Sequence, residues 1–217
     1  MDFEVFKDML LKEFPDVTEL QLKQFRDMEG LYLDWNSKIN VISRKDVDGF
    51  YGHHVLHSLG IASYWCREKV LETLEGMKVL DLGTGGGFPG IPLAVMYPQM
   101  SFTLCDSIGK KIKVVQEVAS ALGLENVTAV NARAESLPGK FDIVVSRAVT
   151  SLENFYPWVK GKYVKGIFYL KGGDINEEIC TLMDRERLKK GSIRTWRMDN
   201  WLDDEYYKEK FVIHIEK

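Results

Sequence analysis

The chain has 217 residues, 45% of them hydrophobic and 12% aromatic, which is enough for one generous α/β domain or for one ordinary domain with an extension. This composition supplies a substantial core and excludes a mainly disordered chain. The 29 lysine and arginine residues against 32 acidic residues give a formal net charge of -3, which argues against a protein that coats nucleic acid by bulk electrostatics. Any RNA contact should therefore be local.

The N-terminal segment mixes acids into its apolar positions and lacks a small-residue cleavage site, so it is not typical of a secretory signal. No run of about 18 apolar residues is present, which argues against a membrane span. These features predict a cytoplasmic protein. The cysteines, Cys66, Cys105 and Cys180, form no C-x-x-C pair, so we expect neither a disulfide framework nor a metal site and interpret them as buried reduced thiols.

The first 70 residues show helical spacing of their apolar side chains, which predicts two amphipathic helices and a third that ends near residue 66. Pro15 ends the first helix, and Asp16 with Glu19 is typical of a capping arrangement that starts the second. A polar stretch from Ser43 to Asp48 connects the second helix to the third. We interpret residues 1–70 as a helical N-terminal extension that packs on a larger domain.

From Met77 onward, short β-branched or aliphatic runs alternate with helical stretches. Such alternation is typical of βαβ units and predicts a doubly wound α/β fold with helices on both faces of a parallel sheet. Residues 191–198 and 210–216 alternate with a period of two, which predicts a C-terminal antiparallel hairpin. We interpret residues 71–217 as this α/β domain, whose five predicted parallel strands are residues 77–82, 101–106, 126–130, 141–146 and 166–171.

The most informative stretch is residues 79–90, where a buried-looking strand leads into five glycines within eight residues. Glycines are needed where a chain turns sharply and a ligand approaches the main chain closely, so this loop is predicted to bind a nucleotide-like ligand. Two interpretations compete. The spacing from Gly85 to Gly90 fits the G-x-G-x-x-G fingerprint of NAD-dependent enzymes, while that from Asp81 to Gly87 fits the acid-led pattern of S-adenosylmethionine enzymes.

Asp81 favours the methyl donor, because an acid two residues before the first glycine would repel a pyrophosphate but could suit an ammonium and a sulfonium, directly or through water. This interpretation places Gly83 and Gly85 against S-adenosyl-L-methionine. The next predicted strand ends at Asp106, which could accept hydrogen bonds from ribose hydroxyls with either cofactor. For Asp106 taken alone, a helix cap is the alternative.

Several motifs together resemble a known family. The most distinctive is VLDLGTGGGFPGIPL at residues 79–93, supported by residues 35–40, 105–111, 132–135, 146–148 and 170–172. Over nearly its whole length the chain resembles RsmG, the bacterial small-subunit ribosomal RNA guanine-N7 methyltransferase family once called glucose-inhibited division protein B. The resemblance implies a Rossmann-like class I methyltransferase domain with cofactor contacts at Gly83, Phe88, Ala134, Glu135 and Arg147.

The sequence departs from the usual family pattern at His53 and His57, which stand where the family has a charge of each sign, and this leaves the role of that helix open.

Candidate RNA contacts are basic, amide or imidazole side chains, and each has a structural alternative. The two lysines at 110 and 111 would meet phosphates only if the fold brings them to the rim of the crevice. Asn36 and Asn40 share a helical face and could either bond RNA or fix the N-terminal extension against the α/β domain. His54 could stack on a base or pack inside the protein. Lys171 could reach an RNA phosphate or be merely solvated. The candidates are Asn36, Asn40, His54, Lys110, Lys111 and Lys171.

The resemblance implies methylation at guanine N7, which carries a free lone pair and loses no proton, so no general base is required. The chain has no Asp/Asn-Pro-Pro-aromatic loop after the fourth strand, where residues 146–149 read SRAV, and we assign no catalytic residue. We expect 7-methylguanosine formation in small-subunit (16S) ribosomal RNA or an assembling small subunit, without an obligate protein partner. The alternatives are a catalytically inactive nucleotide-binding ribosome-assembly factor and an NAD-dependent oxidoreductase.

Overall fold

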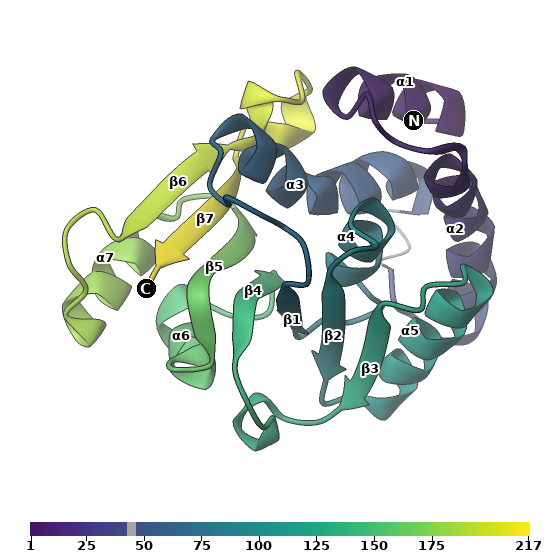
Figure 1. The fold of residues 1–217 in the computed structure, drawn as a ribbon. Coiled ribbons are helices and arrows are strands. Elements are labelled where there is room, and N and C mark those ends of the chain that lie inside the picture. The colour runs from purple at the N-terminus through teal and green to yellow at the C-terminus, as the bar shows by residue number, and fades with distance from the viewer. Residues whose placement is uncertain (43–46) are drawn as a thin grey trace.

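The computed structural model describes residues 1–42 and 47–217, which form a central seven-stranded sheet (Figure 1). The strand order is β3-β2-β1-β4-β5-β7-β6. The first five strands are parallel, and the last two run antiparallel to their neighbours. The strands are β1 Lys78–Leu82, β2 Ser101–Asp106, β3 Val127–Asn131, β4 Phe141–Arg147, β5 Tyr163–Gly172, β6 Ile193–Arg197 and β7 Lys210–Glu216. The predicted doubly wound α/β fold with C-terminal antiparallel strands is confirmed.

The last strand, β7, lies between β5 and β6 rather than at the edge of the sheet. It pairs antiparallel with β5 from Gly166 opposite Glu216 to Gly172 opposite Lys210. Its burial explains this position, because Val212, Ile213 and Ile215 are fully buried, whereas β6 buries only Trp196. The strand richer in apolar residues therefore takes the interior place.

The N-terminal helices are α1 (Phe3–Glu13), α2 (Glu19–Lys38) and α3 (His57–Arg67). A 3₁₀ turn (Val47–Gly49) and a π-helical segment (Phe50–Leu56) lead into α3. Within the polar connection predicted from Ser43 to Asp48, residues 43–46 lie outside the described part of the chain.

The predicted cap of α2 at Asp16 is wrong. Thr18 is the N-cap, and its hydroxyl accepts from the Gln21 amide at 3.3 Å while the Thr18 amide donates to the Gln21 side chain at 2.8 Å. This reciprocal capping box satisfies two main-chain donors at the start of the helix. Thr18 and Gln21 therefore form the cap in place of the predicted pair, Asp16 and Glu19.

Helices cover both faces of the sheet. One face packs against α3, α4 (Gly90–Met96) and α5 (Gly109–Ala121), and the other carries α6 (Leu152–Val159) and α7 (Asn176–Glu186). On the first side α2 packs on α4 and α5, and α1 packs on the segment before α3. Side chains alternate accordingly, since on β1 Val79 faces the first cluster and Leu80 the second. The remaining short helices are 3₁₀ turns at Ala134–Ser136, Met198–Asn200 and Glu205–Tyr207.

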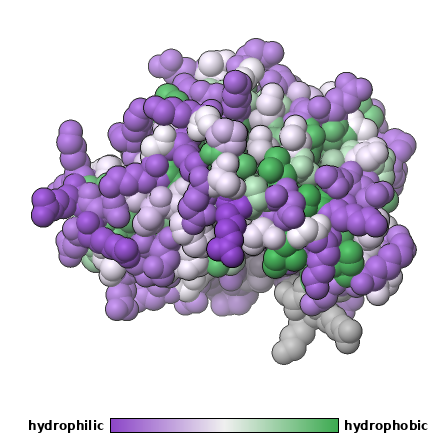
Figure 2. All heavy atoms as spheres, turned by 90° about the horizontal axis from the view of Figure 1, so that it is seen from below, coloured by the Kyte–Doolittle hydropathy of each residue, from purple (hydrophilic) through white to green (hydrophobic). Residues whose placement is uncertain are grey.

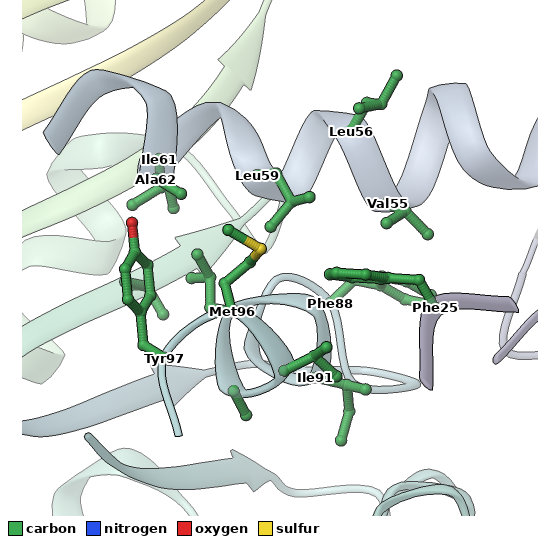
Figure 3. Packing of buried hydrophobic residues seen from close by; sticks show 14 of the residues in the cluster. Phe25, Val55, Leu56, Leu59, Ile61, Ala62, Phe88, Ile91, Met96 and Tyr97 are labelled. Carbon is green, nitrogen blue, oxygen red and sulfur yellow. The ribbon is translucent and has the colours of Figure 1, made fainter. Parts of the chain in front are cut away.

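A single buried cluster joins the N-terminal helices to the helices beside the sheet (Figure 3). In that view Val55 and Leu59 point from above toward Phe88 and Ile91, and Phe25 of α2 approaches from the side. All these side chains are at most 3% exposed. The division of the chain near residue 70 stays a prediction.

The cysteines are free, and the prediction that all three are buried is wrong for two of them. Cys105 is buried in β2, whereas Cys66 and Cys180 are exposed. Cys66 lies on the outer side of the last turn of α3, with its sulfur 3.9 Å from the Tyr97 hydroxyl oxygen. Cys180 lies on α7, which buries only Leu182 fully, so most of that helix faces solvent.

The face seen in Figure 2 has hydrophobic side chains gathered around its middle and hydrophilic side chains around them. Among the described residues, no helix is long and apolar enough to cross a membrane.

Candidate functional site

A cavity of about 610 Å³ lies where the carboxyl ends of β1, β2, β3 and β4 come together. The chain segments that follow these four strands line the cavity. Val41, shortly after α2, and Trp158 of α6 complete its wall. All seven residues predicted to bind the cofactor belong to this lining, namely Gly83, Gly85, Phe88, Asp106, Ala134, Glu135 and Arg147. Residues far apart in the sequence therefore meet at one edge of the sheet, as ligand sites of open α/β sheets do.

The glycine loop presents main chain to the cavity. Gly85 has φ +59°, and a Cβ atom added there would have no other atom within 4 Å, so this face of the loop is open. Gly83 has φ +70°, and its Cβ would lie 2.3 Å from a methyl group of Val149. Gly83 thus allows the segment after β4 to approach, while Gly85 leaves room for a ligand.

Asp81 lies behind the glycine loop and is fully buried, so it is not part of the cavity lining. Its Oδ2 atom accepts from the Thr84 hydroxyl at 2.6 Å and from the Gly90 amide at 2.8 Å. Burial raises the pKa of Asp81 to about 7. The sequence interpretation that placed this carboxylate beside a cationic ligand is therefore corrected, because Asp81 faces inward and fastens both ends of the loop.

Asp106 joins the end of β2 to the glycine loop. Its Oδ2 atom accepts from the Gly85 amide at 3.0 Å, and its Oδ1 atom accepts from the Ile108 amide at 2.8 Å, just before α5 begins. The carboxylate still borders the cavity. The helix-cap alternative for Asp106 is wrong, because the N-cap of α5 is Ile108. Asp106 instead holds the turn before that helix and borders the cavity, where it would meet a ligand.

Arg147, at the end of β4, stands in the wall of the cavity. One Nη atom donates to the main-chain oxygen of His53 at 3.2 Å, and the other lies 3.1 Å from Nδ1 of His54. The guanidinium carbon is 5.1 Å from the centre of the Phe88 ring. The segment before α3 therefore fixes the orientation of this cation.

His54 is 8% exposed, and its ring packs 5.2 Å from the Phe88 ring centre. These contacts favour the packing alternative over stacking on an RNA base.

His53 and His57, whose role the sequence left open, both contact Tyr206 near the C-terminus. The His53 ring stacks on Tyr206 at 3.9 Å between centroids, and His57 meets the same ring edge-on at 6.0 Å. Burial holds the pKa of His57 well below its usual value, with Arg147 adding to the effect. Aromatic contact thus holds this helix against the 3₁₀ turn at Glu205–Tyr207.

Sequence reasoning missed the contribution of α2 to the loop. The buried Tyr32 hydroxyl donates to the Gly86 main-chain oxygen at 2.6 Å, and its ring lies 4.7 Å from that of Phe88. The side chain of Asn36 accepts from the Val41 and Ile42 amides, both at 2.9 Å, which supports its structural alternative. Val41 in turn lines the cavity. No local motif indicates the long-range bond from Tyr32 to Gly86.

Trp158, from α6, also lines the cavity and was missed. Its ring packs against the buried cluster at Phe155 and also borders the cavity, and the sequence gave no sign of this second contact.

The other candidate RNA contacts differ in their exposure and in their distance from the cavity. Lys111 lines the cavity, and Lys110 is exposed beside it in the first turn of α5. Asn40 is exposed after α2. Lys171 is a part-buried side chain whose Nζ atom contacts both carboxylate oxygens of Glu178 and the Thr150 oxygen at 3.2 Å. This ion pair uses the charge of Lys171 inside the fold, so we leave it out of the proposed RNA contacts.

The sheet order and the cavity define a Rossmann-like methyltransferase fold. The Thermus thermophilus 16S rRNA N2 methyltransferase, solved with AdoMet and guanosine, matches with a TM-score of 0.57 at 21% identity, over 76% of this chain and 44% of that chain. A magnesium protoporphyrin IX methyltransferase from Synechocystis with bound SAM matches with a TM-score of 0.55 at 13% identity, over 100% of this chain and 98% of that chain. At these identities the likeness concerns the fold.

Sequence comparison identifies the family. The family model GidB, described as rRNA small subunit methyltransferase G, matches residues 21–197. A relative of that name from Christiangramia forsetii is 48% identical over 96% of both chains. Another from Flavobacterium psychrophilum is 50% identical over 95% of this chain and 96% of its own. The chain belongs to this family of small-subunit ribosomal RNA methyltransferases.

Proposed function

We propose that this chain transfers a methyl group from S-adenosyl-L-methionine to N7 of a guanine in small-subunit ribosomal RNA. The observation that carries the proposal is the cavity in which the open face of Gly85 meets Asp106 and Arg147. Family membership supports the ribosomal RNA substrate. The choice of N7 rests on the chemistry of the lining and on the family resemblance of the motifs.

The residues in the cavity fit the cofactor. Gly83 and Gly85 offer main chain without a Cβ atom, and the Asp106 carboxylate offers an acceptor for ribose hydroxyls. Since β3 lies beyond β2, Ala134 and Glu135 suit the adenine, while the guanidinium of Arg147 suits the methionine carboxylate. When bound, S-adenosylmethionine supplies an electrophilic methyl group on its sulfonium.

The lining is suited to a reaction without proton removal. Among the described residues it contains no histidine or cysteine, and its ionisable side chains are Asp106, Lys111, Arg133, Glu135 and Arg147. Asp106 accepts from two main-chain amides, so this carboxylate positions the loops and keeps acceptor positions for the ribose hydroxyls. A guanine N7 atom needs no base. The work of the protein is then to hold the base against the methyl group and to exclude water.

RNA would reach the cavity over the start of α5. Lys110 and Lys111 lie there, and Arg133 after β3 also borders the opening. These cations can contact phosphates locally despite the net charge of -3. The N7 atom faces the deep major groove of A-form RNA, so the target guanine should lie in an accessible or splayed loop.

The test replaces the target guanine by 7-deazaguanine, in which C–H stands in place of N7 and the Watson–Crick edge is unchanged. We expect methyl transfer to unmodified small-subunit RNA and loss of transfer to the substituted RNA. Transfer at a near-normal rate to the substituted site would refute the N7 assignment.

Two binding experiments test the alternative functions, an inactive ribosome-assembly factor and an NAD-dependent oxidoreductase. Tight binding of S-adenosylhomocysteine without turnover on RNA or on small-subunit particles would favour the inactive assembly factor. Tight binding of NAD with no binding of S-adenosylhomocysteine would favour the oxidoreductase.

A further inference from the structure

The hydroxyl group of Tyr169, on β5, makes three hydrogen bonds to the segment that follows β4. It accepts from the Val149 amide at 2.9 Å and from the Thr150 amide at 3.1 Å, and it donates to the Thr150 oxygen at 2.9 Å. One donor and two acceptor positions are all that a phenol offers, so this hydroxyl is saturated. Tyr169 itself is fully buried. Burial raises the pKa of Tyr169, so the group remains a donor at neutral pH.

The segment held in this way is conformationally unusual and borders the cavity. Ala148 has φ +49°, a region that residues with a side chain rarely adopt. Ala148 and Val149 line the cavity, and Val149 occupies the space beside Gly83. Without the hydroxyl group, the amides of Val149 and Thr150 would lose their acceptor. The longer contacts of the segment would remain, from Lys171 Nζ to the Thr150 oxygen at 3.2 Å and from the Ala148 amide to the Leu170 oxygen at 3.4 Å.

Sheet order indicates which part of the reaction this segment faces. The strands β3, β2, β1 and β4 lie in that order, and the proposed adenine and ribose contacts follow β3 and β2. The sulfonium end of the cofactor would then lie toward β4. The residues after β4 thus stand where the methyl group and the accepting base meet.

We propose that Tyr169 is a positioning residue for methyl transfer, which acts by fixing Ala148–Thr150 at the acceptor side of the cavity. This inference rests on the proposed function. The glycine loop is held separately by Asp81, Asp106 and Tyr32. Loss of the Tyr169 hydroxyl should therefore impair the transfer step much more than cofactor binding.

The experiment compares Tyr169→Phe with Tyr163→Phe. Tyr163 lies on the same strand and in the same buried cluster, and its hydroxyl donates to the Tyr156 hydroxyl at 3.4 Å rather than to the segment after β4. We expect the Tyr169 variant to transfer methyl in single turnover at saturating cofactor about 10- to 100-fold more slowly, the range typical of small misplacements of reacting groups. Its Kd for S-adenosylhomocysteine should stay within about threefold of the wild-type value, a change below 1 kcal/mol. The Tyr163 variant should keep the wild-type rate.

Hydrogen exchange supplies a readout that does not depend on turnover. The amides of Val149 and Thr150 should be protected in the wild type and in Tyr163→Phe, and should exchange faster in Tyr169→Phe. An unchanged transfer rate, unchanged protection, or an equal loss of rate and cofactor affinity would each overturn the inference. If the wild type itself transfers no methyl group, the proposed function fails, and the exchange result alone decides whether Tyr169 fixes the segment.

Discussion

Substitution of Gly85 by valine tests the assignment of the glycine loop. Gly85 has φ +59°, so any side chain costs roughly 1–2 kcal/mol of folding free energy in this left-handed conformation. A Cβ atom at this position meets no protein atom within 4 Å and projects into open space. The added volume should therefore clash with a bound cofactor and not with the folded protein.

Gly123→Val is the matched control. Gly123 has φ +67°, its added Cβ also meets nothing within 4 Å, and it lies after α5, outside the lining of the cavity. Both variants should lose a similar amount of stability. Steric intrusion of about 1–3 kcal/mol would weaken cofactor binding by about 5- to 150-fold in Gly85→Val alone.

The assay combines urea unfolding, which measures stability, with calorimetric titration of S-adenosylhomocysteine, which measures affinity. If Gly85→Val binds this ligand as tightly as the wild type does, the loop assignment is wrong. Equal loss of affinity in both variants would show that general destabilisation is the cause.

The remaining predictions concern charge and pH. Reversal of Lys110 and Lys111 to glutamate should weaken RNA binding and reduce its salt dependence, and an unchanged salt slope would remove this patch from the RNA contacts. Arg147→Ala should weaken S-adenosylhomocysteine binding by about 10- to 150-fold, the equivalent of one charged hydrogen bond, and Arg147→Lys should restore little because lysine lacks the fork; normal binding by either variant would contradict this. Burial lowers the pKa of His214 from 6.5 to about 4, so the stability linked to its neutral form is present above pH 6.5 and is lost as the pH falls toward 4. In urea unfolding, His214→Gln should show a shallower loss over that pH interval, and an unchanged slope would assign the acid sensitivity to other groups.

The parallel strands were predictable because strands buried on both faces form short apolar runs that a sequence displays directly. The place of β7 inside the sheet was not, since an alternating pair indicates a hairpin but not which of its strands meets β5. The π-helical start before α3 also has no pattern of its own in the sequence. The cap of α2 was misplaced because two capping pairs overlap within six residues, and only geometry selects Thr18.

The convergence of Asp106, Ala134 and Arg147 was predictable, because the carboxyl ends of neighbouring parallel strands meet at one edge. The partners of Tyr32 and Lys171 were not. Tyr32 meets Gly86 across 54 residues of sequence, and Lys171 is paired with Glu178 on a separate helix. Such contacts depend on how helices dock on the sheet, which residue types and spacing do not encode locally.

The hydrogen bond from Tyr32 to Gly86 bears on how far parts can be exchanged between members of this family. One end of that bond belongs to an N-terminal helix and the other to the glycine loop, so we expect the two segments to be matched to one another. A chimera that joins the first 70 residues of one relative to the remainder of another would bring a new helix surface against the old loop. Such a hybrid should keep its cofactor affinity only when the new N-terminal helix carries a tyrosine whose hydroxyl can reach the Gly86 carbonyl oxygen. Shuffling experiments that cut elsewhere, between α5 and β3 for example, leave this bond intact and should tolerate more divergent parents.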